Sequence, residues 1–335
     1  MYNAEFKEKF LADTTITKQA RDNRRRTFNL FEEYESKKNA DLCTMSSEEI
    51  QNVLNSASSG MRARSNDNDI ITIRSYIKWC AVNNISGVSL DGLNVTSSNI
   101  EQIRTHTVKN PLHLKKFLDD VFIERDGTTF DPLKCFFWMA FGGCNEEDVM
   151  YLTNNDIDFD SRIIKGRSWQ GILYKEGIDT VRQCAEATEF LYINSQYVNK
   201  GDIMRERVPG NCIFRGVRGS STPDLIVFRS NISRKVKDAI AKGKTDLNLS
   251  YYRVWLSGIF YRMRELEIAG YLTDKNFEAL ANMFLKTKSK DDIYYERHIN
   301  SKLDNPNISK QDRGTFLRKV NDYKTDYENW KLTII

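Results

Sequence analysis

Three groups of basic residues are the first candidates for chemistry in this chain, because they could bind phosphate. Residues 17–26 (TKQARDNRRR) carry five bases and one acid. The segment 205–218 carries four arginines, and residues 229–253 carry seven bases against two acids. A single charged run is often just a solvated helix face. Three such groups, spread along the chain, favour a protein that binds the backbone of a nucleic acid.

The composition limits the classes of protein that fit. The chain has 335 residues, and its 50 Lys and Arg against 46 Asp and Glu give a net charge of +4. This balance excludes a histone-like polycation, whereas the local distribution of charge still allows nucleic-acid binding. The length suggests about two domains. The longest apolar stretch, Cys135–Cys144, has ten residues, and a membrane helix needs roughly 18. We expect no signal peptide, no membrane partner and a cytoplasmic protein.

Metal and nucleotide cofactors are not expected. The six cysteines contain no C-x-x-C pair, and there are only three histidines, so a zinc site is disfavoured. Reduced, mostly buried thiols in a cytosol are the plain interpretation. The sequence Gly243-Lys244-Thr245 is similar to the end of a P-loop. However, Asp238 stands where such a loop needs its upstream glycine, which excludes that motif.

The pattern of apolar residues predicts a helical domain over residues 1–104. Four short amphipathic helices are expected: over 1–11, after a Thr17 cap, after a serine cap near Ser46, and from about residue 66. Residues 82–109 are dense in Ser, Asn, Gly and Thr, which is typical of a linker.

Residues 105–335 predict a second domain that is mainly α with a small β-sheet. Strands are expected at 162–165 and 170–174, and a basic, loop-rich segment at 199–223. The predicted helices cover 112–122, 131–141, 146–152, 180–194, 232–241, 249–267, 273–285 and 310–330.

Three stretches of the second domain resemble the tyrosine recombinase (phage integrase) superfamily. The first is FWMAFGGCNEEDVMYL at 137–152, followed by 155–158 (NDID). The second is LSYYRV at 249–254, and the third is LANMFLK at 280–286, followed by Tyr294-Tyr295. The resemblance implies a helical SAM-like core-binding domain joined to a catalytic-type domain, with both forming a C-shaped clamp on DNA. The chain is also similar to the repressors of SPβ-type prophages, a group with this recombinase-like fold.

The departures from the recombinase pattern bear on activity. The resemblance implies an arginine where Cys144 stands, a histidine at Ser250 and a histidine at Lys286, which leaves Arg253, Lys286 and Tyr295 as vestigial site residues. Losing one pre-organised charged donor costs roughly 10²–10³ in rate. We therefore expect no active catalytic residue and no enzyme activity.

Three functional hypotheses remain open at this stage. The leading one is a sequence-specific transcriptional repressor of double-stranded DNA in a phage or prophage (lysogeny) context. The alternative is an active site-specific recombinase or integrase in which Arg167 or Arg215 replaces the missing arginine. A third is a module that docks on a true recombinase through its C-terminal helices.

The residues expected to contact operator DNA come from both domains. They are Lys18, Arg21, Arg24, Arg25, Arg74, Lys78, Lys165, Arg167, Arg215, Arg253 and Lys286. The C-terminal helix over 310–335 could pair two copies of the chain, although packing on its own domain is the simpler expectation. The expected location is the bacterial cytoplasm, in association with the nucleoid.

Overall fold

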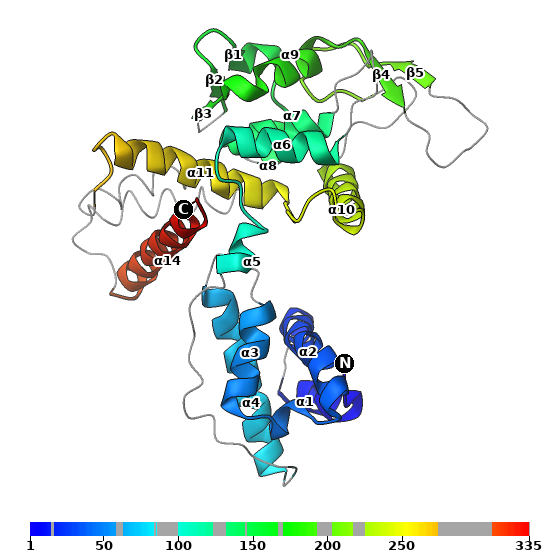
Figure 1. Ribbon diagram of the computed structural model, residues 1–335, viewed down its shortest axis with the longest axis vertical. Helices are drawn as coiled ribbons and strands as arrows, with labels where there is room; N and C mark the ends of the chain where they lie inside the picture. The colour runs from blue at the N-terminus through cyan, green and yellow to red at the C-terminus, as the bar shows by residue number, and fades with distance from the viewer. Residues whose placement is uncertain are drawn as a thin grey trace. The chain divides into compact units, whose positions relative to one another are not determined.

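The computed structural model describes residues 1–14, 17–57, 63–83, 85, 100–122, 132–144, 146–166, 170–192, 203–216, 225–273 and 310–334. The chain divides into two compact units, Met1–Ile103 and Arg104–Ile335, which are described separately below (Figure 1). It is mainly helical with small antiparallel sheets, which confirms the predicted fold class.

The first unit is built from helices whose starts the sequence encodes. Its elements are α1 (Ala4–Thr14), α2 (Lys18–Lys38), the 3-10 turn η1 (Leu42–Thr44), α3 (Ser47–Ala57), α4 (Ala63–Val82) and most of α5 (Ile100–Arg104). The hydroxyl of Thr17 accepts the backbone N–H of Ala20 at the start of α2. At α3, Ser46 and Glu49 each accept the backbone N–H of the other. These caps satisfy backbone donors that have no partner within the helix.

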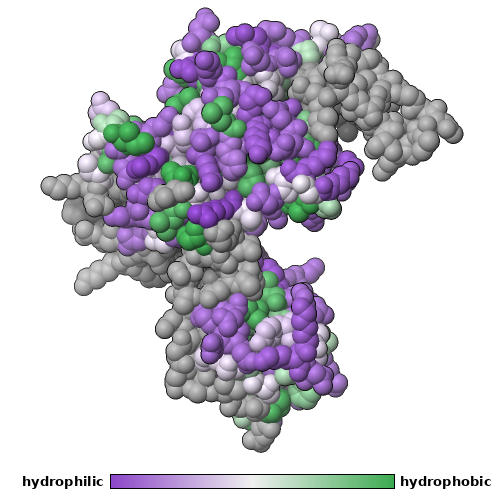
Figure 2. All heavy atoms as spheres, in the orientation of Figure 1, coloured by the Kyte–Doolittle hydropathy of each residue, from purple (hydrophilic) through white to green (hydrophobic). Residues whose placement is uncertain are grey.

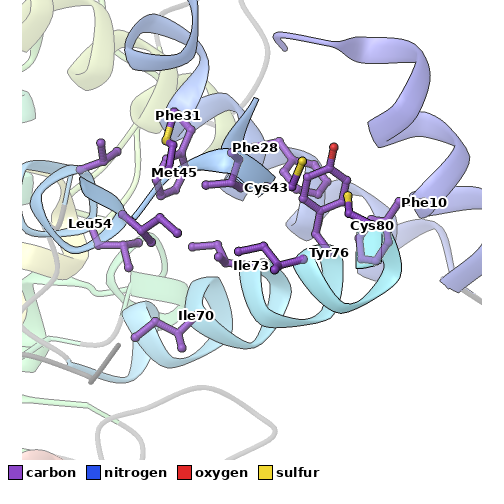
Figure 3. Close-up of a cluster of buried hydrophobic side chains, with 14 of the residues drawn as sticks. Phe10, Phe28, Phe31, Cys43, Met45, Leu54, Ile70, Ile73, Tyr76 and Cys80 are labelled. Atoms are coloured by element: carbon purple, nitrogen blue, oxygen red, sulfur yellow. The ribbon is translucent and has the colours of Figure 1, made fainter. Parts of the chain in front are cut away.

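The core of the first unit is aromatic and aliphatic (Figure 3). Phe10, Phe28 and Tyr76 meet edge to face, with ring centroids 5.1–5.8 Å apart. These residues come from α1, α2 and α4, so the core joins the first two helices to a third that lies further along the chain. The hydroxyl of Tyr76 donates to the carboxylate of Asp41, which gives this buried ring its polar partner.

The second unit is organised around the crossing of two helices. Its helices are α6 (Pro111–Val121), α7 (Pro132–Phe141), α8 (Glu146–Val149), α9 (Ile178–Glu186), α10 (Leu225–Ala241), α11 (Tyr251–Ile268) and α14 (Lys310–Ile334), with 3-10 turns at Asn154–Asp156 and Lys175–Gly177. Helix α7 is buried from Leu133 to Phe141. Gly258 on α11 lies directly against the backbone of Phe141, so that α11 crosses α7 without a side chain between them.

Two small sheets complete the second unit. Strands β1 (Ile157–Asp158), β2 (Ile163–Lys165) and β3 (Gln170–Ile172) pair in that order, and Ile164 lies opposite Gly171. Strands β4 (Glu189–Tyr192) and β5 (Ile203–Glu206) form a separate pair. Two predictions are wrong here, because the helix expected to reach residue 194 ends at Glu186 and the expected loop contains β5. The aromatic Phe190 and Tyr192 favour strand over helix.

Helix α14 packs against α11 within the same unit (Figure 1). The indole of Trp330 is fully buried and donates to the carbonyl of Val108 over 3.0 Å. Tyr327 donates to the carboxylate of Glu267, which also pairs with Lys331. The simpler expectation, that this helix packs on its own domain, is therefore confirmed for the described residues.

The described surface is largely polar. Hydrophilic side chains dominate the face shown in Figure 2. In the part of the chain that the structure describes, no helix is long and apolar enough to span a membrane. Five of the six cysteines are buried as free thiols, and Cys212 is exposed.

Candidate nucleic-acid interface

The N-terminal half of α2 presents the first basic surface. Lys18 is exposed, whereas Arg21, Arg24 and Arg25 are half-buried. Arg25 donates to both carboxylate oxygens of Glu8 over 2.8 and 2.6 Å, and this pairing lowers the pKa of Glu8. The side chain of Arg25 therefore ties α1 to α2. Ion pairs this exposed to solvent are weak because water and salt screen them, so a phosphate can compete for the same guanidinium.

Arg24 also has an internal role. Its guanidinium donates to the hydroxyl of Thr14 over 2.6 Å and lies 5.3 Å from the centre of the Phe10 ring. The cation–π contact and the hydrogen bond both fix the end of α1. The fold therefore already holds the Arg24 side chain in place, and its contact with DNA stays a prediction.

The outer face of α4 carries the second basic surface of the first unit. Arg74 and Lys78 are exposed, four residues apart, so they lie one above the other on the helix. The opposite side of α4 is buried through Ile70, Ile73 and Ile77. The helix therefore separates a core-facing side from a solvent-facing side that carries positive charge.

In the second unit, the turn after α7 holds the position where the recombinase pattern has its first arginine. Gly143 has φ +97°, a conformation that favours glycine. Cys144 follows, fully buried, and its thiol faces the sulfur of Met139 at 3.8 Å. Burial raises the pKa of Cys144 well above its usual range. A neutral thiol offers neither the charge nor the two-pronged donor that an arginine gives to phosphate.

A buried arginine that sequence reasoning missed fills the space beside this turn. Arg262 on α11 is 7% exposed, and its guanidinium donates to the carbonyl of Phe141 over 3.2 Å. A β-carbon on Gly143 would lie 2.6 Å from Nη2 of Arg262. The sequence does contain a pattern that predicts this burial, because Arg262 continues the buried stripe of Tyr251, Trp255 and Gly258 at helical spacing. The positive charge of Arg262 therefore lies inside the protein and is bound to the carbonyl of Phe141.

The start of α11 lies next to the same turn. The hydroxyl of Tyr251 donates to the carbonyl of Cys144 over 2.9 Å. Ser250, at the expected histidine position, caps the helix by accepting the backbone N–H of Arg253 over 3.4 Å. At the position where the resemblance implies a histidine, Ser250 thus serves as the N-terminal cap of α11.

Arg253 is the arginine of this site that faces outward. Its guanidinium donates to the carbonyl of Asn248 over 2.7 Å, and burial lowers its pKa to about 10. Within the described residues, no carboxylate pairs with it. A half-buried guanidinium without an acidic partner suits an anion such as phosphate, which would supply the missing negative charge.

The β2–β3 hairpin is attached to the turn after α7. The backbone N–H of Ile172 donates to the carbonyl of Gly142 over 2.9 Å. Lys165 is exposed at the far end of β2, opposite Gln170. The turn after α7 is thus bonded to the hairpin that carries Lys165 through Ile172, and to the helix that carries Arg253 through Tyr251.

Arg215 is engaged in holding the end of α9. Its guanidinium donates to the carbonyls of Ala185, Ala187 and Gly210 over 2.7–3.1 Å. Arg207, which is 5% exposed, binds the carbonyls of Cys184, Ala187 and Ile213. Two arginines at a helix C-terminus satisfy carbonyls that have no partner within the helix. Arg167, Lys286, Tyr294 and Tyr295 lie outside the described residues.

Comparison with known families finds a match in the first unit. Residues 1–82 match the family described as "MrpR, N-terminal core-binding domain". The match covers the region that holds the four helices α1–α4, and it confirms the resemblance to a core-binding domain. No curated protein matches the chain.

Two solved structures were found similar to most of the chain. One is the XerA recombinase, with 13% identity and a TM-score of 0.32, covering 89% of this chain and 98% of that one. The other is the Tn1549 transposon integrase in complex with a circular intermediate DNA, with 12% identity and a TM-score of 0.36, covering 88% and 98%.

Within the described residues, no group of three His, Cys, Asp or Glu side chains is arranged to hold a metal ion. The candidate interface consists of three groups of cationic side chains: those of α2 and of α4 in the first unit, and those around Arg253 in the second.

Proposed function

We propose that this protein is a sequence-specific binder of double-stranded DNA that represses transcription and does not cleave its target. Its first domain, which matches the core-binding family, supplies the exposed bases of α2 and α4. Its second domain supplies Arg253 and the exposed Lys165. The resemblance to prophage repressors gives the biological context, lysogeny in a bacterial cytoplasm.

The observation that carries the absence of cleavage is the buried, uncharged Cys144. Strand cleavage needs paired cations on the non-bridging oxygens of the scissile phosphate, because negative charge develops there. At this position a thiol is enclosed by Met139 and the α11 helix. The adjacent Arg262 is buried against Phe141, so its guanidinium is occupied inside the protein.

The alternative, an active recombinase with a rearranged site, would need another arginine to take this place. Arg215 was one candidate, and its three bonds to backbone carbonyls tie it to α9. Those contacts favour the repressor over the recombinase.

The proposal is tested by selecting bound duplexes from genomic DNA with the full chain and measuring their affinity at several salt concentrations. We expect a defined recognition sequence and an affinity that falls steeply with salt, since the predicted contacts are cationic. Cells carrying a reporter behind the selected sequence should show lower expression when the protein is present. Absence of any sequence-selective binding would contradict the proposal.

A further inference from the structure

One aliphatic side chain lies on the solvent-facing side of α4. Ile71 is 57% exposed, although α4 buries Ile70, Ile73 and Ile77 on its other side at 3% exposure or less. Residue 71 is therefore outside the stripe that packs the core of the first unit. Exposing a branched apolar side chain to water has no benefit for the fold.

The neighbours of Ile71 on this face are cationic. Arg74 and Lys78 follow at three and seven residues and are exposed, so they share its helix face. The hydroxyl of Ser75 points back to the carbonyl of Ile71 over 2.7 Å. The described part of this face therefore presents the apolar Ile71 beside two cations, with the exposed Val82 at the end of the helix. This combination is complementary to a polyanion that also carries a small apolar group.

Duplex DNA has that combination in its major groove. The groove is wide enough for a helix, and the C5-methyl of thymine is the apolar group that it exposes between the two phosphate strands. Positive charge binds the phosphates, whereas the methyl contact depends on the base.

We propose that Ile71 is a specificity-determining residue that contacts the methyl group of one thymine in the recognition sequence. Arg74 and Lys78 bind phosphates beside it. This inference rests on the proposed DNA binding and deepens it, because it names the base feature that α4 reads.

The test replaces each thymine of the selected duplex in turn by deoxyuridine, which lacks only the methyl group. The wild-type chain should lose affinity about fourfold at one position, the effect of one lost methyl contact. Ile71→Ala should lose about the same on the thymine duplex and show no further loss with deoxyuridine at that position. The matched control is Ile268→Ala, because Ile268 is 72% exposed at the end of α11; its affinity and thymine preference should not change. Equal melting midpoints of the variants exclude unfolding as the cause.

The inference is overturned if Ile71→Ala binds as well as the wild type. It is also overturned if the variant binds more weakly but still loses affinity about fourfold with deoxyuridine at the same position as the wild type, which would place Ile71 in a contact between proteins. If the wild-type chain selects no duplex at all, the proposed function fails together with this inference, and that outcome is distinct from the other two.

Discussion

Arg253 and Arg215 differ in what their guanidinium groups contact, and that difference separates their roles. Arg253 has one bond to a backbone carbonyl, whereas Arg215 binds three carbonyls around the end of α9. Both were expected to contact DNA, Arg253 from the resemblance to the recombinase pattern and Arg215 from its place in a basic segment. The structure leaves Arg253 available for phosphate and gives Arg215 a structural contact.

Replacing Arg253 with alanine should weaken binding to all duplexes alike. Loss of one phosphate contact lowers the slope of log affinity against log salt by about 0.9 and leaves the preferred sequence unchanged. The measurement is a salt titration of affinity with the selected duplex. Arg264→Ala is the control on the same helix, since Arg264 pairs with Glu267. An unchanged slope in Arg253→Ala would remove this residue from the interface.

Replacing Arg215 with methionine should destabilise the fold. The change leaves carbonyls of α9 without a partner, which costs about 1–3 kcal/mol. Chemical unfolding measured by circular dichroism checks this value. Arg182→Met, on the exposed side of α9, should change stability by less than about 0.5 kcal/mol. A fully stable Arg215→Met with weak DNA binding would instead support a direct contact with DNA.

At the scale of elements, the close crossing of α7 and α11 positions the turn that carries Cys144. Gly258 allows the two helices to approach each other closely. Tyr251, two turns before it on α11, then reaches the carbonyl of Cys144, and Arg262, one turn after it, reaches the carbonyl of Phe141. The turn that carries Cys144 is held by these contacts from α11 and by the bond from Ile172 of β3 to Gly142.

Gly258→Ala should be strongly destabilising even though alanine favours helices by about 1 kcal/mol over glycine. The added methyl group would overlap the carbonyl of Phe141, and overpacking in a core costs typically 1–3 kcal/mol beyond that gain. A lower melting midpoint is the expected result. Gly270→Ala is a useful comparison, since a β-carbon there meets no neighbouring atom but the residue has φ +78°. A melting midpoint of Gly258→Ala equal to that of the wild type would show that the crossing can open.

In the first unit, a buried ion pair joins α1 to α2. Lys7 and Glu35 are both fully buried and paired, and Glu35 also accepts the backbone N–H of Leu42 over 2.8 Å. Burial raises the pKa of Glu35 despite this pairing. Removing only the lysine would leave a carboxylate without a counter-charge, which costs about 3–5 kcal/mol.

Lys7→Met should therefore make the first unit sensitive to pH. A carboxylate whose folded-state pKa is above its unfolded value of about 4.3 favours the fold below that value. This stability is lost as pH rises through the folded-state pKa. Hydrogen exchange of the α1 and α2 amides between pH 4 and 8 should show increasing opening of Lys7→Met at higher pH. Adding Glu35→Gln should remove the trend, and a flat profile in Lys7→Met alone would contradict the account.

The sequence predicted the elements with local signals and missed those set by distant contacts. Thr17 and Ser46 mark helix starts by their own side chains, and the short hairpin was recognised from its residues. Strand β4 was missed because its hydrogen bonds go to β5, which begins eleven residues after β4 ends. Arg262 was missed because its charge suggested the surface, whereas its position in an apolar stripe indicated burial. Which arginines would face solvent could not be predicted, because carbonyls from distant segments decide it.

For the whole molecule, the first unit supports DNA binding and the second unit bears on cleavage. The first unit matches a family of core-binding domains and presents exposed bases on two helices. In the second unit, the turn after α7 is bonded to the β2–β3 hairpin and to α11, and it carries the buried thiol of Cys144. The proposed function combines these two observations: DNA binding by the exposed bases, and no cleavage because an uncharged thiol stands where the resemblance implies an arginine.

The most direct test of this central claim is a suicide-substrate assay, in which a nicked duplex bearing the selected sequence traps any covalent protein–DNA adduct. The account predicts a shifted, non-covalent complex and no adduct after denaturation, for the wild-type chain and for Tyr295→Phe alike. A covalent adduct that forms with the wild-type chain and disappears in Tyr295→Phe would contradict it and establish an active recombinase.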